Sequence, residues 1–242
     1  KEWPSALDDL GDRRPYVLWT RGATSFLARP LNDLVTITGA RASTSYGDHV
    51  AGQLASDLAN AERLVVAGGA YGIEGAAHRA ALASGGDTIA VMANGVDRMY
   101  PMGHRELLER VADLGLIVSE VPPGAVPTRH RFIARARIMA ALSAATVVVE
   151  AGVRSGSMTV ARRARELGRT VGAVPGPVTS SQSLGPHRLL NEGAFLVSHL
   201  SDLDSRREPE VADRRGSSPA PHRQSVEPDR VLRRHDDLNL AR

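Results

Sequence analysis

Residues 63–84 read RLVVAGGAYGIEGAAHRAALAS and place a strand, a glycine turn and a helix in immediate succession. Residues 64–67 form an apolar run typical of a strand buried on both faces. From Gly72 onward, small and apolar residues recur with a helical period. The turn holds Gly68, Gly69 and Gly72, and the N–H groups that begin the helix favour an anion such as phosphate. A tight turn without any ligand explains the same glycines equally well, because one glycine loop is weak evidence.

The same alternation of strand and helix continues on both sides of this unit. Further strands are predicted at residues 16–20, 34–38, 88–92, 116–119, 146–149 and 170–174, and an apolar piece at residues 195–197 closes the domain. Further helices are predicted at residues 45–60, 104–114, 132–142 and 158–167, and from residue 186. This order predicts an α/β fold with a mostly parallel sheet and helices on both faces. Six strands run into turns that hold glycine, and ligands of such sheets bind beyond the carboxyl ends, so we expect the site at that edge.

Composition excludes several classes of protein. The chain has 242 residues and no cysteine, which excludes a disulfide scaffold and suits a cytoplasmic protein. No apolar run reaches the roughly 18 residues of a membrane span, and no signal peptide is visible. We therefore expect a cytoplasmic location and no membrane partner.

The positive charge is concentrated in one part of the chain. Lys1 is the only lysine, which leaves 29 arginines. Residues 128–169 carry nine arginines against two acids, a net charge of +7. Guanidinium groups suit phosphate geometry. A solvated helix face explains the arginines at 162, 163 and 165. It explains less well those that surround Phe132, and an aromatic ring flanked by arginines is typical of base stacking combined with phosphate contact; these are Arg129, Arg131, Arg135 and Arg137.

The common catalytic and cofactor motifs are absent. A Walker A loop needs a lysine, and a dinucleotide fingerprint needs an acid where Ala93 and Asn94 stand. The turn at Ser155 lacks the glycine of a nucleophile elbow, since Val153 stands there. The eight histidines show no metal-binding spacing, and His78 is interpreted as a packing residue. We expect no cofactor and no metal.

Three acids follow strands and are candidate general bases: Glu74, Glu120 and Glu150. No nucleophile accompanies them in the sequence. The pattern therefore predicts a phosphate-binding edge without catalytic apparatus, and so a protein that is not an enzyme.

Six stretches taken together resemble the DprA/Smf family: VTITGARASTSYG, VVAGGAYGIEGAAHRAAL, IVSEVPPG, RHRFIARARIMAALS, VVVEAGVRSGSMTVA and VPGPVTSSQSLGPHRLL. The resemblance covers about residues 15–200 with the motifs in order. It implies an extended Rossmann-like domain that binds single-stranded DNA, forms a homodimer, protects incoming DNA and loads the recombinase RecA in natural transformation. The arginine-only composition and the RHRF and PGPVTS forms are typical of an actinobacterial member.

The resemblance also implies which residues bind DNA. The family's G-S-R turn falls on Gly39, Ala40 and Arg41. Its S-G-x-A-x-G-I-D loop falls on residues 67–74, with Glu74 replacing aspartate. Its F-P-x-R-N-R-I-I-A stretch falls on residues 132–140, where Ile133 replaces proline and Ala136 replaces asparagine. Its E-A-x-x-x-S-G-[SA] turn falls on residues 150–157 and includes Arg154, Ser155 and Gly156.

Three regions are expected. Residues 1–33 form a lead-in with an edge strand, and residues 34–202 form the Rossmann-like DNA-binding domain. Residues 203–242 are charged, poor in apolar residues and expected to be a disordered tail. Family members often carry an N-terminal helical domain and a C-terminal winged helix, and neither is expected in full within these residues.

Two other functions fit the same fold. One is a nucleotide phosphoribohydrolase of the lysine-decarboxylase-like type, although that family's P-G-G-x-G-T-x-x-E motif is absent. The other is a nucleotide-binding module without a DNA role.

Helical spacing separates the arginines around Phe132. Arg131 and Arg135 share a face, while Arg137 lies about 200° beyond Arg135. We expect Arg41 and Arg135 to contact phosphates with little effect on stability, and Arg137 to be structural. Phe132 is interpreted as a stacking platform, with a cap on the core as the alternative.

Overall fold

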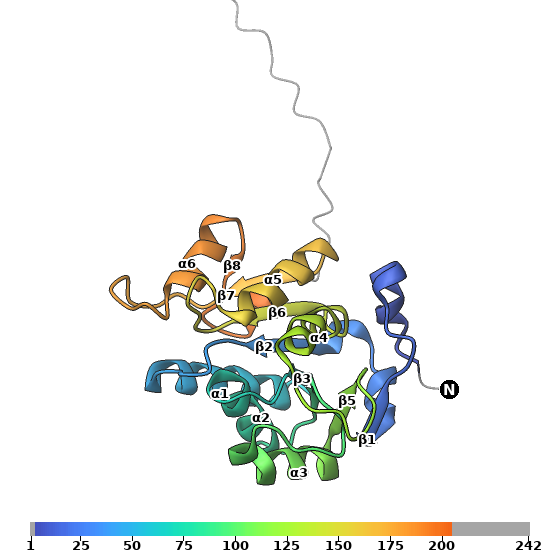
Figure 1. Cartoon of the computed structure of the whole chain (residues 1–242). Coiled ribbons are helices and arrows are strands. Elements are labelled where there is room, and N and C mark those ends of the chain that lie inside the picture. Colours follow the sequence, from blue (N-terminus) through green and yellow to red (C-terminus); the bar gives the residue numbers. More distant parts are fainter. Residues whose placement is uncertain (1–2, 205–242) are drawn as a thin grey trace, which may run out of the picture. The chain divides into compact units, whose positions relative to one another are not determined.

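The apolar runs form one mostly parallel sheet. The structure is a computed structural model and describes residues 3–204 (Figure 1). Among these residues the strands pair in the order β1-β5-β4-β3-β2-β6-β7-β8. Every neighbouring pair is parallel except β1 with β5, which confirms the predicted fold class. The strands are β1 Trp19–Gly22, β2 Leu34–Thr38, β3 Leu64–Ala67, β4 Thr88–Val91, β5 Leu116–Ser119, β6 Ala145–Val148, β7 Thr170–Ala173 and β8 Phe195–Leu196.

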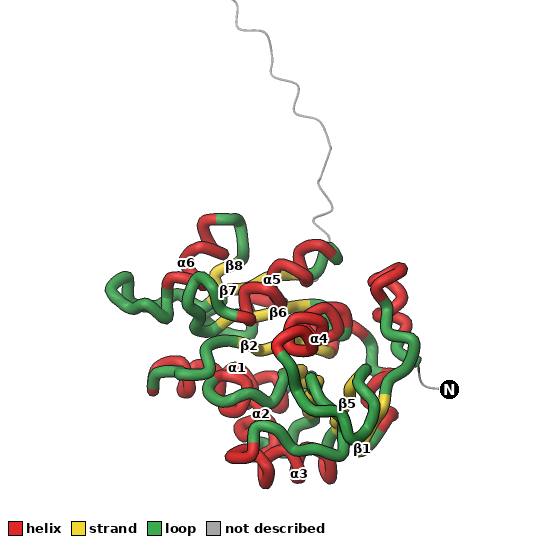
Figure 2. Tube along the Cα trace, viewed as in Figure 1, coloured by secondary structure: helices red, strands yellow, loops and turns green. Residues whose placement is uncertain are grey.

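Helices cover both faces of this sheet (Figure 2). Helices α1, α2 and α3 pack on one face, and α4 and α5 pack on the other. Side chains alternate along each strand, so β2 presents Val35 and Ile37 to α1 and α2, and presents Leu34 to the opposite core. The helices are α1 Ser45–Asn60, α2 Ile73–Ala83, α3 Arg105–Leu114, α4 Arg129–Ala141, α5 Gly156–Glu166, α6 Leu184–Asn191 and α7 Ser201–Asp204.

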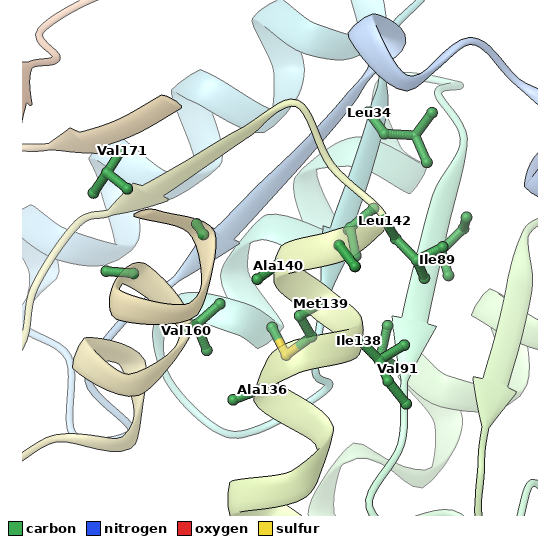
Figure 3. Packing of buried hydrophobic residues seen from close by; sticks show 14 of the residues in the cluster. Leu34, Ile89, Val91, Ala136, Ile138, Met139, Ala140, Leu142, Val160 and Val171 are labelled. Atoms are coloured by element: carbon green, nitrogen blue, oxygen red, sulfur yellow. The ribbon is translucent and has the colours of Figure 1, made fainter. Parts of the chain in front are cut away.

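Helix α4 anchors the larger core and carries much of the predicted site. Its residues Ile138, Met139 and Ala140 are buried among strand residues such as Ile89 and Val91 (Figure 3). The C-terminal half of α4 is therefore fixed against the sheet. Its N-terminal half, which carries the arginines, extends to the carboxyl edge of the strands.

The strand order reverses beside β2. The chain runs from β2 outward through β3, β4 and β5, and α4 then brings it back to β6 on the other side of β2. The loops after β2 and β6 consequently leave in different directions. In open α/β sheets the crevice at this reversal is where ligands bind.

Several element boundaries differ from the prediction. Helix α4 begins at Arg129 rather than Phe132, because the Thr128 hydroxyl accepts a hydrogen bond from the Arg131 N–H at 3.3 Å and caps the helix. Strand β1 begins at Trp19, three residues after the predicted start. Helix α5 begins at Gly156, two residues before the predicted start.

The N-terminal segment contributes to the core as well as to the sheet edge. Leu7 and Leu10, from the 3₁₀-helical segment Ser5–Arg13, and Leu27 are buried in the same cluster as α4. Leu203 was predicted to lie in the tail, but it lies in α7 and is buried beside Val197. Residues 205–242 lie outside the described residues, and their expected disorder stays a prediction.

Candidate nucleic-acid interface

A cleft of about 450 Å³ lies at the reversal of strand order, and we call it the main cleft. Its walls come from the loop after β2, the start of α2, the face of α4 and the turn that begins α5. Among its lining residues are Gly39, Ala40, Arg41, Ala70, Glu74, Phe132, Arg135, Ala136, Arg154, Ser155, Gly156 and Gln182. The main cleft therefore lies at the carboxyl edge of the sheet, where the sequence predicts the site.

Two further hollows adjoin the main cleft and share Arg41 and Phe132 with it. The side recess, about 110 Å³, is lined by Gly68, Tyr71, Met92, Asn94, Tyr100 and Arg135 among others. The outer groove, about 630 Å³, is lined by Arg129, Ile133, Arg154, Ser155 and Gly156 among others. All three hollows therefore border the ring of Phe132.

The loop after β2 is clamped to the end of β6. The Ala40 N–H donates to the Glu150 carbonyl at 2.5 Å. The Glu150 carboxylate accepts from the Thr44 N–H at 2.9 Å and the Thr44 hydroxyl at 2.6 Å. A Cβ at Gly47 would overlap this carboxylate, so the first turn of α1 needs glycine there. Arg41 therefore projects from a loop held at both ends.

The glycines after β3 mainly allow other parts of the protein to pack closely against this turn. A Cβ at Gly68 would overlap the guanidinium of Arg135, and one at Gly72 would overlap the carbonyl oxygens of Ala40 and Arg41. The Ile73 N–H already donates to the Ala40 carbonyl at 3.2 Å. Gly69 and Gly72 line none of the three hollows. This geometry favours the tight-turn interpretation of Gly69 and Gly72 over an anion site at the start of α2.

The start of α5 is better placed for an anion. Ser155 is the N-cap and accepts from the Ser157 N–H at 3.4 Å, and the first turn contains no acidic residue. Ser155 and Gly156 line both the main cleft and the outer groove, and the adjacent Arg154 is exposed. The positive end of this helix therefore faces the hollow together with an arginine.

Phe132 stands at the centre of the site. Its ring is half-buried and lines all three hollows. The guanidinium carbons of Arg41 and Arg135 lie 4.9 Å and 5.3 Å from the ring centroid, within cation–π range. Tyr100 lies 6.1 Å away, ring centre to ring centre. Phe132 is in none of the three buried clusters, so its position favours a platform over a cap on the core.

Arg135 is a buried structural residue as well as a wall of the cleft. It is 8% exposed and donates to the carbonyl oxygens of Gly68 at 2.7 Å and Val91 at 3.3 Å. Its Nη2 lies 3.6 Å from the carboxylate of Glu74. Burial lowers the pKa of Arg135, and the charge of Glu74 opposes that shift. This burial and these contacts argue against the expectation that Arg135 matters little for stability.

The other predicted arginines are divided between the site and the scaffold. Arg129 is exposed and lines the outer groove. Arg131 donates to the Val126 carbonyl and lines none of the three hollows. Arg137 faces elsewhere and binds both carboxylate oxygens of Glu120, at 2.7 Å and 2.5 Å. This contact agrees with the structural role expected for Arg137.

The +7 segment does not form one basic patch. Arg163 pairs with Glu166 at 2.6 Å, Arg165 with Glu192 at 3.2 Å and Arg169 with Asp9 at 2.5 Å. The exposed arginines that line the main cleft or the outer groove are Arg41, Arg129 and Arg154. The net positive charge that a ligand can contact is therefore smaller than the +7 counted along residues 128–169.

The three candidate general bases all have structural partners. The Glu74 carboxylate accepts from the Thr38 hydroxyl at 2.8 Å and the Ala70 N–H at 3.0 Å. Glu120 and Glu150 are held by Arg137 and Thr44 as described. The hydroxyls in these contacts belong to Thr38, which is buried, and to Thr44, which caps α1.

His78 packs inside the protein as predicted. It is fully buried, and its Nδ1 lies 2.7 Å from the Thr88 hydroxyl. Burial lowers the pKa of His78 to about 4. Within residues 3–204 no three histidine, cysteine or acidic side chains gather as metal ligands, and no helix is long and apolar enough to cross a membrane.

Several site residues escaped the sequence analysis. Asn94 follows β4 at the carboxyl edge, so the rule that placed the site there also marks it. Tyr71 lies in the glycine turn after β3 but was not singled out there. Tyr100 and Gln182 carry no such signal, because long loops bring them to the site.

The family model of DNA recombination-mediator protein A matches residues 1–207. The chain belongs to this family. A putative DNA processing protein DprA of Mycobacterium tuberculosis is 50% identical over 212 residues, which cover 84% of this chain and 54% of the relative. The chain thus spans about half the length of that relative. The mycobacterial match confirms the predicted DprA/Smf resemblance and its actinobacterial character.

Two solved DprA structures share the fold. DprA from Streptococcus pneumoniae is 38% identical with a TM-score of 0.81, over 86% of this chain and 72% of that one. DNA processing protein A from Helicobacter pylori is 31% identical with a TM-score of 0.76, over 84% of this chain and 91% of that one. The latter structure is described as giving insight into a single-stranded DNA binding mode.

The departures from the DprA motifs lie in the walls of the site. Ala136 is 3% exposed and lines the main cleft without any hydrogen-bonding group where the family pattern has asparagine. Ile133 is half exposed and lines the outer groove with an apolar surface where the pattern has proline. Glu74 keeps the carboxylate of the usual aspartate and uses it to hold Arg135.

Proposed function

We propose that this chain binds single-stranded DNA along the main cleft and the outer groove, and acts as a non-catalytic recombination mediator. The observation that carries the proposal is the half-buried Phe132 ring, with the guanidinium groups of Arg41 and Arg135 within cation–π distance of it. Single-strand sites combine a basic groove for the backbone with aromatic rings for the bases. In a duplex the bases are paired and stacked, so they are not offered to a recessed ring.

The backbone contacts follow from the exposed charges of the site. Arg41, Arg129 and Arg154 are exposed at the hollows, and the start of α5 adds a helix N-terminus with no acidic residue in its first turn. Phosphate oxygens suit both kinds of partner. We therefore assign phosphate contacts to Arg41, Arg129 and Arg154, with Ser155 and Gly156 at the helix end.

The wider role comes from the family. Membership supports a cytoplasmic homodimer that protects incoming single-stranded DNA and loads RecA during natural transformation. Because the chain spans about half of its mycobacterial relative, the binding of RecA and the pairing of two copies need measurements on this chain itself.

One experiment separates this function from the two alternatives. A titration with fluorescent oligo(dT) is set beside a hydrolysis assay on nucleoside monophosphates. We expect saturable oligo(dT) binding, weaker duplex binding and no release of free base. Release of base would favour the phosphoribohydrolase, and binding of free nucleotides without DNA would favour the nucleotide-binding module.

The salt dependence of binding counts the phosphate contacts. Each neutralised phosphate of a single strand contributes about −0.7 to the slope of log affinity against log salt. With three exposed arginines at the site, we expect a slope near −2 from these contacts. Arg154→Ala should make the slope shallower by about 0.7. An unchanged slope in that variant would contradict the assignment of Arg154 to a phosphate.

Arg41 and Arg137 should separate binding from stability. Arg41→Ala removes an exposed side chain, so the free energy of unfolding should change by less than about 0.5 kcal/mol while DNA affinity falls severalfold. Arg137→Ala breaks a partly buried bidentate ion pair and should cost about 2 kcal/mol of stability with unchanged affinity per folded molecule. Urea denaturation and oligo(dT) titration measure both quantities. Equal effects of the two variants in both assays would refute the division of roles.

A further inference from the structure

A fourth hollow, of about 460 Å³, lies beside helix α4, and we call it the N-terminal groove. One wall is formed by residues 12–17, and α4 contributes His130, Ala134 and Arg137. In Figure 1, α4 lies between α5 and the dark-blue N-terminal segment, and it contacts both. The residues of this groove line none of the other three hollows, so the function proposed above leaves the groove without a role.

The N-terminal groove meets the outer groove at the first turn of α4. Arg129 lines the outer groove, and the next residue, His130, lines the N-terminal groove. Consecutive residues of a helix point about 100° apart, so the two grooves lie on neighbouring faces of α4. Ile133 lies between these faces and is 51% exposed. The first turn holds no acidic residue, so a negatively charged strand can pass across it from one groove to the other.

Tyr16 presents a fully exposed aromatic ring at the N-terminal groove. Its relative exposure of 101% is the highest of any large apolar side chain among the described residues. The chain on either side of the ring is fixed, because Pro15 is buried and Leu18 packs on the core beneath α4. The Arg13 carbonyl is held as well, since it accepts a hydrogen bond from Arg137 Nε at 2.7 Å. A flat ring on a fixed segment is what a base needs for stacking.

The charges of the groove suit a phosphate backbone. Arg137 and Glu120 neutralise each other through their bidentate contact, which leaves Arg13 and Arg14 against one acid, Asp12. Arg13 and Arg14 are exposed, and their carboxylate partners lie 3.6 Å and 3.0 Å away. Exposed ion pairs of this kind contribute little, so phosphate oxygens can take the place of those partners.

We propose that the N-terminal groove is a second contact for the bound single strand, in which a base stacks on Tyr16 while Arg13 and Arg14 contact the flanking phosphates. The strand reaches this groove from the outer groove, across the first turn of α4. The inference rests on the proposed binding of single-stranded DNA and lengthens the binding site on this chain. Stacking on a protruding ring requires a base whose face is free, so the second contact also favours a single strand over a duplex.

A series of oligo(dT) strands of increasing length tests this second contact on the full chain. Short strands fill the main cleft and the outer groove, and longer ones also reach Tyr16. Tyr16→Ala should leave the affinity for short strands unchanged and weaken long strands about five- to tenfold. Tyr16→Phe keeps the ring and should bind every length as the wild type does. The urea midpoint should be the same in all three proteins, because the side chain is fully exposed.

The arginines have a matched control. Arg14 and Arg105 are similarly exposed, at 59% and 63% of the side chain, and each lies 3.0 Å from a carboxylate. Only Arg14 lines the N-terminal groove. Arg14→Ala should make the salt slope for long strands shallower by about 0.7 and leave that for short strands unchanged. Arg105→Ala should change neither slope.

A photocrosslink locates the base directly and needs no variant. One 5-iodouracil is placed at successive positions of a long oligo(dT), because light joins this base to an aromatic ring stacked on it. We expect a crosslink to Tyr16 at a position displaced along the strand from the one that crosslinks to Phe132. A long strand that crosslinks to Phe132 at some position but to Tyr16 at none would overturn the inference.

The outcomes separate this groove from the function beneath it. If the wild-type chain binds no oligo(dT) of any length, the proposed function is wrong and the inference falls with it. If the chain binds oligo(dT) but Tyr16→Ala matches the wild type at every length, the second contact is overturned and the proposed function stands. Equal weakening of short and long strands would also overturn it. A change in the molar mass of free Tyr16→Ala with unchanged DNA binding would assign the groove to a second protein chain instead.

Discussion

Arg135→Ala is expected to lower the free energy of unfolding by about 3 kcal/mol and to weaken DNA binding as well. The guanidinium is buried against Glu74, which is itself 4% exposed, and it also satisfies the carbonyl oxygens of Gly68 and Val91. Removing it leaves a buried carboxylate without its cation and opens space beside Gly68. Urea denaturation measures the loss of stability, and oligo(dT) titration at a temperature where the variant is folded measures the loss of affinity.

The carboxylate provides the control for this prediction. Adding Glu74→Gln to Arg135→Ala removes the uncompensated charge, so the double variant should be more stable than Arg135→Ala alone. Arg41→Ala serves as the matched exposed arginine and should retain wild-type stability. If Arg135→Ala proves as stable as Arg41→Ala, the ion pair with Glu74 does not support the fold.

Phe132→Ala should weaken binding to single-stranded DNA by about 1–3 kcal/mol, which is roughly five- to 150-fold in affinity. The ring is half-buried, lines all three hollows and has two guanidinium groups within cation–π distance. No charge is lost, so the slope of log affinity against log salt should not change. The loss should be similar for every base sequence, because every base has a face to stack.

Stability distinguishes this role from core packing. Truncation of a fully buried phenylalanine to alanine lowers the free energy of unfolding by about 3–5 kcal/mol. Phe132→Ala should lower it by clearly less. Phe132→Leu keeps apolar volume without a flat face, so it should lose most of the affinity and little stability. Phe26→Ala is a matched truncation at a half-buried ring packed on the main core, and it should lose stability without a specific loss of binding. Full affinity in folded Phe132→Ala would end the stacking hypothesis.

Much of this protein follows from local patterns. The strands at residues 34–38, 64–67 and 116–119 were predicted with their observed ends, because apolar runs bounded by turns have few alternative conformations. The carboxyl edge was predicted because parallel strands must end together there. The DprA/Smf motifs then marked Gly39, Arg41 and Phe132, which all line the main cleft.

The roles of individual side chains were harder to predict. Helical spacing separated Arg137 from Arg135 correctly, since the angle between them depends on the helix alone. It could not show that Arg135 is buried, because that depends on Gly68, Glu74 and the end of β4, which lie far away in sequence. The net charge of residues 128–169 overstated the positive charge at the site for the same reason, because the acidic partners of several arginines lie outside that segment.

The sequence by itself determined the class of fold, the edge that carries the site and the family, because each depends on periodicity, chain direction or residue order. Only the tertiary structure decided what each loop does at that edge. It placed the reversal of strand order between β2 and β6, closed the start of α2 with the Ala40 carbonyl and left the start of α5 facing the main cleft. It also brought Asn94 and Tyr100 beside Phe132. The physical reason is that burial and hydrogen bonding are completed by residues distant along the chain, so no local pattern records them.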